Sequence, residues 1–319
     1  MLCSSEFNSS LPNCSIWERT NEDATFAQGM VYLTDLLPHV EEVLKEKILQ
    51  ATPIRGGDIH SAFCLIDSRR RKWFLKANSA PSAALMFRRE AQDLAILGAA
   101  GVIRTPKVIG QGQSKRGDAF LILEFIDSGR QTPVFWERFG RNLAAMHAQT
   151  SAFFGFAHDN YIGRLPQSNR RCSTWAEFYA SERLEPQMRL ARQQGFLDKT
   201  AERQLDNLCA RLNDLCPEEP PALTHGDLWS GNFLCNTLEE PVLIDPAAAY
   251  AHREMDLAMS RLFGGFDPRF YTAYEEVSPL EPGFEQRQTI YQLYYLLVHV
   301  NLFGASYEAS VRRILRQWS

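Results

Sequence analysis

The stretch "LTHGDLWSGNFL" at 223–234 carries acidic and amide side chains that suit a metal-bound phosphate. Asp227 and Asn232 lie five positions apart in it, and Asp245 follows in "PVLIDP" at 241–246. Carboxylate and carboxamide oxygens are hard ligands, and Mg²⁺ commonly takes one or two of them together with oxygens of a substrate phosphate. Apolar residues flank all three side chains. We therefore expect a site at the edge of the core, where an unpaired carboxylate would be costly.

The spacing of these side chains is typical of phosphoryl transfer from a nucleotide. A D-x-x-x-x-N pattern after His225 matches the catalytic loop of kinases. In that loop the Asp accepts the proton of the attacking hydroxyl and the Asn binds magnesium. We therefore predict Asp227 as the base, and Asn232 and Asp245 as metal ligands. The simpler alternative for Asp245 is a buried residue that caps the turn before Pro246.

Two features nearer the N-terminus could hold the nucleotide. Lys76 ends the apolar run "FLKAN", and Glu90 lies 14 residues later in a predicted helix, where it could hold Lys76 by an ion pair. Gly56 and Gly57 separate two predicted strands and would let the backbone approach phosphate oxygens. Each feature also has a simpler explanation, because the charges could lie on the surface and the glycines could form a plain hairpin turn.

Two details favour a small acceptor over a protein segment. Gly226 stands where protein kinases carry an Arg that pairs with a phosphorylated activation loop. Ten residues separate Asp245 from Asp256, which leaves no room for an activation segment or a peptide-docking surface. We expect Asp256, in "HREMDLA", to anchor the catalytic loop.

The periodicity of the chain predicts a β-rich part followed by a mainly helical part. The elements expected in the first part are helices over 31–50 and 84–101, a strand, Gly-rich turn and strand over 51–67, and strands over 72–78, 107–113 and 119–127. From about residue 130 the spacing is largely helical, interrupted by short strands near 233–236 and 242–245. Ligands favour the cleft between two such lobes.

The composition fits a globular protein large enough for two lobes, since the 319 residues are 45% hydrophobic and 23% charged. A net charge of −4 disfavours nucleic acid or an anionic membrane as a partner. The seven cysteines show no C-x-x-C pair, so we expect reduced thiols in a cytoplasmic protein rather than disulfides or a zinc site.

Two segments are set apart from the predicted fold. Residues 1–29 are polar and aperiodic, and we expect them to be an extension outside it. The most apolar run, at 290–303, is shorter than the ~18 residues of a membrane span and is interrupted by His299 and Asn301. We expect a protein that does not cross a membrane, and a monomer is favoured.

Three stretches together resemble the fructosamine (ketosamine) kinase family: "LTHGDLWSGN", "LIDPAAAYAHREMDLAMSRLFGGF" and "IYQLYYLLVHVNLFG". The resemblance covers roughly residues 31–319 and belongs to a branch of the aminoglycoside- and choline-kinase-like fold. It implies an α+β, protein-kinase-like structure of two lobes. The N-lobe, at 30–124, would hold about five antiparallel strands and one helix, and the C-lobe, at 125–319, would be mainly helical.

The resemblance also implies an activity, which is transfer of the ATP γ-phosphate to a sugar hydroxyl of a ketosamine. Such acceptors are rearranged sugar adducts of amines, including those on protein lysines. ATP and Mg²⁺ would be the cofactors, with backbone near Glu124 and Ile126 at the adenine. Trp229 would lie along the sugar, unless it is a core aromatic residue. His299 and Asn301 do not share one helix face, so one would line the sugar pocket and the other would hold the helix.

One position departs from the family pattern. Some members carry a Cys after the paired glycines, whereas this chain has Asp58, so we expect no thiol control of that loop. Two other functions remain open on the residues alone. The first is a kinase of an aminoglycoside, choline or homoserine, for which Glu275, Glu276 and Glu281 offer acidic side chains. The second is a binding module without turnover.

Overall fold

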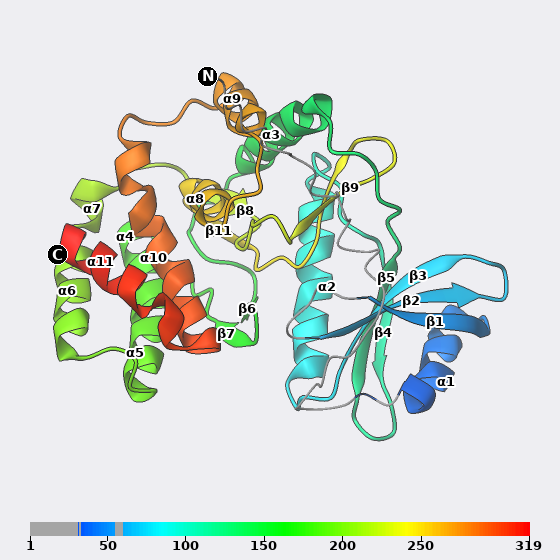
Figure 1. Cartoon of the computed structure of the whole chain (residues 1–319). Helices are drawn as coiled ribbons and strands as arrows, with labels where there is room; N and C mark the ends of the chain where they lie inside the picture. Colours follow the sequence, from blue (N-terminus) through cyan, green and yellow to red (C-terminus); the bar gives the residue numbers. More distant parts are fainter. Residues whose placement is uncertain (1–30, 32, 55–59) are drawn as a thin grey trace, which may run out of the picture.

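A computed structural model of the chain describes residues 31, 33–54 and 60–319. Within them, an antiparallel sheet of five strands precedes a mainly helical part (Figure 1). The strands are β1 (Ile48–Ile54), β2 (Ser61–Asp67), β3 (Lys72–Asn78), β4 (Val108–Gln113) and β5 (Ala119–Glu124), in the spatial order β1-β2-β3-β5-β4. The two-lobe α+β arrangement is the one expected from the sequence.

A helix covers each face of this sheet. They are α1 (Leu33–Leu44) and α2 (Ala83–Ala99). Leu75 and Ile122 pack in the cluster with α1, whereas Phe74 and Leu121 pack in the cluster with α2. Because successive strand residues point to opposite faces, Lys76 shares the face of Phe74, which turns its ammonium toward α2.

The prediction of a helix over 31–50 is wrong about where the helix ends. It ends at Leu44, and β1 begins at Ile48. Lys45 adopts a φ of 55°, which takes the chain out of the helix, and the Glu41 carboxylate accepts the amide of Ile48 at 2.9 Å. The error arises because Ile48 also falls on the apolar spacing of the helix.

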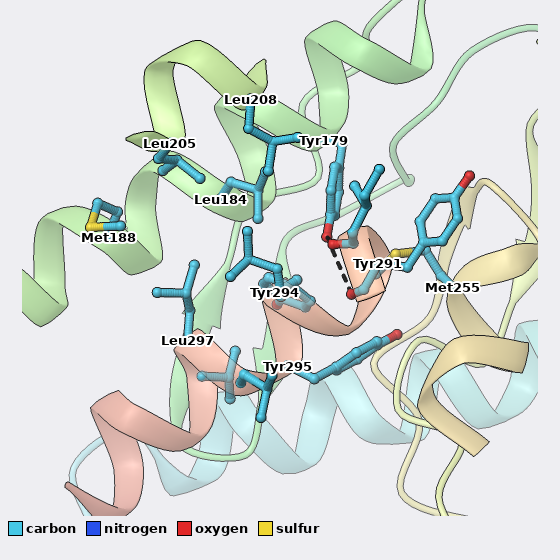
Figure 2. Close-up of a cluster of buried hydrophobic side chains, with 14 of the residues drawn as sticks. Tyr179, Leu184, Met188, Leu205, Leu208, Met255, Tyr291, Tyr294, Tyr295 and Leu297 are labelled. Carbon is cyan, nitrogen blue, oxygen red and sulfur yellow. Dashed lines mark hydrogen bonds between the residues drawn. The ribbon is translucent and has the colours of Figure 1, made fainter. Parts of the chain in front are cut away.

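The C-lobe is built around one long buried helix, α10 (Phe284–Phe303). Figure 2 shows Tyr291, Tyr294 and Tyr295 of this helix in one buried cluster with Tyr179. The Tyr179 hydroxyl lies 2.6 Å from the Ile290 carbonyl oxygen and 3.2 Å from that of Tyr291. The other C-lobe helices are α3 (Pro133–His147), α4 (Trp175–Phe178), η1 (Tyr179–Leu184), α5 (Glu185–Gln193), α6 (Lys199–Ala210), α7 (Leu212–Leu215), α8 (Glu254–Leu262), α9 (Pro268–Val277), η2 (Ala305–Tyr307) and α11 (Glu308–Trp318). In the part of the chain that the structure describes, no helix is long and apolar enough to cross a membrane.

Three pairs of short strands frame the loops of the C-lobe. They are β6 (Asn160–Ile162) with β7 (Leu165–Gln167), β8 (Ala222–Thr224) with β11 (Ala249–Ala251), and β9 (Phe233–Cys235) with β10 (Pro241–Leu243). The loop at 225–232 joins β8 to β9, and the segment at 244–248 joins β10 to β11. The β9–β10 pair matches the two predicted strands. The other four strands were not predicted.

The predicted boundary between the lobes, at residue 124, falls on the last residue of β5, and we propose to keep it as the division. Residues 1–29 lie outside the described part. Five cysteines lie within it, namely Cys64, Cys172, Cys209, Cys216 and Cys235, and all five are free thiols.

Candidate active site

Asp256, at the start of α8, fixes the backbone of the loop between β8 and β9. Its two carboxylate oxygens accept the backbone amides of His225, at 2.7 Å, and Gly226, at 2.9 Å. His147 adds a third contact, at 3.2 Å from the same carboxylate. Asp256 is fully buried, so it fixes the loop backbone and does not face a ligand. This is the anchoring position that its place in the sequence suggested.

The backbone geometry at residue 226 explains why this position holds a glycine and not the Arg of protein kinases. The φ of Gly226 is +81°, and a Cβ there would lie 2.0 Å from the carbonyl oxygen of Ala247. The amide of Ala247 in turn donates to the His225 carbonyl at 3.0 Å. The catalytic loop therefore packs directly on the segment that follows Asp245, and any side chain at residue 226 would push the two apart.

We expect Gly226→Ala to lower the rate of phosphoryl transfer by about 100-fold and to destabilise the fold, because both the clash and the left-handed backbone oppose it. The matched control is Gly195→Ala, since Gly195 has a φ of +79° with nothing within 4 Å of a Cβ. The control should lose about 1–2 kcal/mol of stability and keep its rate. Thermal melts and kinetics on both variants measure this. Equal rates for the two variants would contradict the role of the close approach.

The ring of His225 has a defined tautomer. Nδ1 accepts the amide of Asp227 at 3.2 Å, so Nε2 carries the proton and donates to the Ile244 carbonyl at 2.9 Å. Burial lowers the pKa of this histidine, which keeps the ring neutral. His225 therefore links the catalytic loop to the residue before Asp245 and is not itself a proton acceptor for a substrate.

Asp227 and Asn232 meet across the turn of this loop. The Asn232 amide nitrogen donates to the Asp227 carboxylate at 3.0 Å and to the Asp227 carbonyl at 2.9 Å. Because its nitrogen is used in this way, the amide oxygen of Asn232 is the atom that suits a cation. Burial and the charge of Asp245 raise the pKa of Asp227 to about 7. Its basic form therefore accumulates as the pH rises through that value.

Lys76 joins the two lobes at the site. Its ammonium lies 2.7 Å from Glu90 of α2 and also contacts the carboxylate of Asp245. Asp245 has a φ of 54°, a conformation that Asp tolerates better than most residues. Its side chain is 44% exposed, so it faces the cavity instead of capping a turn inside the core. The surface-charge explanation for Lys76 fails as well, because its side chain is only 6% exposed.

These side chains line one cavity of about 710 Å³ between the lobes. Aromatic rings form part of its wall, namely those of Trp229, Phe263, His299, Phe303 and Tyr307. The rings of Phe263 and Tyr307 lie 4.7 and 5.0 Å from that of His299. The Trp229 ring folds back over Gly231, where a Cβ would come within 2.2 Å of it. Trp229 is 37% exposed, so it is a wall of the cavity and not a core residue.

Comparison with known proteins identifies the family. The fructosamine kinase family model matches residues 34–318. The chain belongs to this family. A Synechocystis protein named a probable ketoamine kinase is 42% identical over 274 residues, covering 85% of this chain and 90% of the relative. A chloroplastic protein-ribulosamine 3-kinase of Oryza sativa subsp. japonica is 38% identical over 275 residues, covering 84% of this chain and 78% of that protein.

Solved structures agree with this assignment. A candidate fructosamine-3-kinase from Thermobifida fusca superposes with a TM-score of 0.80 at 37% identity, covering 88% of this chain and 97% of that one. A thermostable mutant of the aminoglycoside phosphotransferase APH(4)-Ia, in ternary complex with AMP-PNP and hygromycin B, gives a TM-score of 0.62 at 18% identity, covering 89% of this chain and 98% of that one. The second match shows the fold alone. The fold class and the resemblance inferred from the sequence are thus confirmed.

The fructosamine kinase fold places some predicted residues away from the cavity. Of His299 and Asn301, only His299 lines it, whereas the Asn301 amide donates to the Gln187 carbonyl at 2.9 Å in the C-lobe core. Asn301 therefore holds the helix, which is one of the two roles expected for this pair, and His299 is left as the candidate for the sugar pocket.

At the expected adenine end, Leu123 and Pro106 line the cavity. Glu124 and Ile126 are not among the lining residues. The Glu124 amide donates to the Lys107 carbonyl at 2.8 Å, so that donor is already used. Ile126 is buried. A role for this backbone at the adenine stays a prediction. Gly56, Gly57 and Asp58 lie outside the described residues.

His60 is a cavity residue that the sequence analysis missed, and it lies near Lys76. The Asn78 side chain accepts the amide of Ala80 through its oxygen at 2.7 Å and offers its nitrogen to His60 Nδ1 at 2.9 Å. The proton of the His60 ring is therefore on Nε2. Because His60 lines the cavity, it can offer a neutral donor beside the ammonium of Lys76. No local pattern in the sequence indicated this.

Proposed function

We propose that this protein transfers the γ-phosphate of ATP to a sugar hydroxyl of a ketosamine, either a free adduct or one on a protein lysine. The observation that carries the proposal is the joint contact of Lys76 with Glu90 and Asp245, in the same cavity as Asp227 and Asn232. A cation for the phosphates, two metal ligands and a base are what phosphoryl transfer needs from a protein. By analogy with relatives named 3-kinases, we place the phosphate on the 3-hydroxyl.

Each side chain has a separate task in this proposal. Lys76, held by Glu90, binds phosphate oxygens of the nucleotide. Asp227 accepts the proton of the sugar hydroxyl and orients its oxygen toward the γ-phosphate. Asn232 and Asp245 would hold Mg²⁺, which neutralises charge on the phosphates when bound. Catalysis then depends on positioning and electrostatics, with no covalent intermediate on the protein.

The donor set fits a magnesium ion that is shared with a substrate. Among the described residues, no group of three or more His, Cys, Asp or Glu could hold a metal by itself. Magnesium is usually bound by one or two protein oxygens, with water and phosphate oxygens completing the shell. The half-exposed Asp245 carboxylate and the Asn232 amide oxygen supply that number. We therefore expect the metal to bind together with ATP.

The acceptor end of the cavity favours a sugar over a polycation. The acidic residues among the described lining of the cavity are Glu90, Asp93, Asp227 and Asp245. Glu90 and Asp245 contact Lys76, the Asp93 side chain is only 1% exposed, and Asp227 is the proposed base. The glutamates considered for a cationic acceptor, Glu275, Glu276 and Glu281, are not part of the lining. An aromatic wall suits the apolar face of a sugar ring and a single ammonium group. Aminoglycosides carry several positive charges and are therefore disfavoured.

His299 provides a polar group in this aromatic wall. Its Nδ1 donates to the Tyr295 carbonyl at 2.7 Å, and burial lowers the pKa of the ring. The ring is therefore neutral, with Nε2 as an acceptor. A hydroxyl or the protonated amine of a ketosamine could donate to this nitrogen.

We expect Trp229→Ala to raise the KM for a ketosamine about tenfold and to change the KM for ATP by less than twofold, because the indole belongs to the acceptor wall. Phe153→Ala is the matched control, since Phe153 is also exposed, at 46%, and is not part of the cavity lining. Steady-state kinetics with each substrate varied in turn measure the effect. A change in the KM for ATP alone would place Trp229 outside the acceptor site.

The proposed function is tested by ADP release with a panel of acceptors. The panel holds fructosyl-lysine, ribulosyl-lysine, choline, homoserine and an aminoglycoside, with Asp227→Asn as the blank. We expect turnover with the two ketosamines only. Turnover with choline, homoserine or the aminoglycoside alone would overturn the acceptor and keep the kinase. No turnover, together with ATP binding, would favour a binding module.

The cellular location and assembly are part of the same proposal. We keep the cytoplasm as the predicted location and the monomer as the predicted state. The rice relative named above is chloroplastic, so location differs within the family. Sedimentation of the purified protein tests the assembly.

A further inference from the structure

A buried carboxylate on α2 has no place in the chemistry described so far. Asp93 lies three residues after Glu90, on the same face of the helix, and its side chain is only 1% exposed. It belongs to the N-lobe, yet all its hydrogen-bond donors belong to the C-lobe. They are His158 Nε2 at 2.8 Å, the Asn160 side-chain amide at 2.7 Å and the backbone amide of Ala248 at 3.2 Å.

The partners of Asp93 are themselves fixed by further buried contacts. The Asn160 amide also donates to the Ala248 carbonyl at 2.9 Å, and its oxygen accepts Gln167 at 2.8 Å and Asn169 at 2.9 Å. Every hydrogen-bonding position of the Asn160 side chain is thus used. Asn160, Gln167 and Asn169 are each at most 3% exposed. A buried polar network in which each member is satisfied is rigid.

The network reaches two other parts of the C-lobe. The Tyr294 hydroxyl of α10 donates to Gln167 at 2.5 Å, and Arg183 donates to Asn169 at 2.6 Å. Figure 1 shows α2 standing beside the β6–β7 hairpin that carries this network. Ala248 lies three residues beyond Asp245. Asp93 therefore attaches the helix that carries Glu90 to the segment that carries the proposed metal ligand.

We propose that Asp93 is a positioning residue that fixes α2 to the C-lobe and so holds Glu90 against Lys76 at all times. In protein kinases the corresponding helix must be brought into place to complete the Lys–Glu pair, and its position is controlled. Here three hydrogen bonds to the other lobe replace such control. The nucleotide clamp of this protein is therefore assembled before ATP binds and needs no activating step.

The inference predicts a specific kinetic effect, and it rests on the proposed kinase activity. Asp93→Asn removes the negative charge that three C-lobe donors face and replaces one of the two acceptor oxygens by a donor. We expect the KM for ATP to rise about tenfold and the KM for the ketosamine to change less than twofold. In a Glu90→Gln background the same substitution should change kcat/KM for ATP less than threefold, because Asp93 acts through Glu90.

A matched control separates positioning from simple loss of stability. Asp67, in the β2–β3 turn, is also a buried carboxylate. It accepts hydrogen bonds from several donors, among them the Arg69 and Arg71 amides at 2.9 Å each. Asp67→Asn should lower the melting temperature and leave the KM for ATP unchanged. An Asp93→Asn protein that only melts earlier, or whose effect is equally large in both Glu90 backgrounds, overturns the inference.

A second pair of variants covers the case in which Asp93→Asn does not fold. His158→Ala removes one donor from a partly exposed position, and His158→Gln keeps a donor at the same place. We expect a KM for ATP about threefold higher for the Ala variant and within 1.5-fold of wild type for the Gln variant. Equal values for the two would overturn the inference. Wild-type protein without turnover would instead contradict the proposed function.

Discussion

Asp227→Asn lowers kcat for phosphoryl transfer by about 1,000-fold, within the range that a general base contributes, and leaves the affinity for ATP within threefold of wild type. The substitution keeps the size of the side chain and an oxygen that Asn232 can still reach at the present 3.0 Å. It removes only the ability to take a proton. Stopped reactions that quantify the phosphorylated ketosamine, together with calorimetry of ATP binding, measure both quantities.

The pH dependence gives a second readout for Asp227. Since burial and Asp245 raise its pKa to about 7 without a metal, kcat/KM of wild type should increase as the pH rises toward that value. A positive ion at Asp245 would lower the pKa of Asp227. The midpoint of the kcat/KM profile should therefore move to lower pH as the magnesium concentration increases. A variant with a rate within tenfold of wild type would contradict the assignment of the base.

Asp245→Asn abolishes the magnesium dependence of ATP binding and lowers kcat by at least about 1,000-fold. Asn is the informative replacement, because residue 245 has a φ of 54° and Asn tolerates the left-handed region at least as well as Asp. The backbone should therefore stay in place while the charge is lost. Loss of that charge also lowers the pKa of Asp227, so the base remains deprotonated and cannot account for the lost rate.

Calorimetry of ATP binding with and without magnesium measures this prediction. Asp198→Asn is the control, since Asp198 caps α6 through the amides of Thr200 and Ala201 and should affect stability alone. Magnesium-dependent ATP binding that persists in Asp245→Asn would show that the metal is held elsewhere.

Each part of the candidate site could be predicted from the sequence because the pattern that marks it is local. Asp227 and Asn232 lie in one loop, Asp245 follows in the next, and an apolar strand leads into Lys76. Alternation along β3 then decides which face Lys76 occupies. Such patterns survive in a single sequence, since each is set by neighbours a few positions away.

The contacts of Asp93 with the C-lobe could not be predicted in this way. Asp93 meets Asn160 across 67 positions and Ala248 across 155, and nothing local to any of the three indicates the others. A weak signal existed, because an acidic residue stands among the apolar positions of "AQDLAIL". In the sequence, Gly226 stood out because protein kinases carry an Arg at that position. The physical reason for a glycine there is the close approach of Ala247, which only the folded chain reveals.

The measurement that tests the central claim most directly is the identity of the product. Purified protein is incubated with ATP, magnesium and fructosyl-lysine, and phosphorus and carbon NMR locate the new phosphate. The account predicts an ester on the sugar 3-hydroxyl in the wild-type reaction and none with Asp227→Asn. Phosphate on the amine portion, or ADP with free inorganic phosphate and no ester, would contradict it.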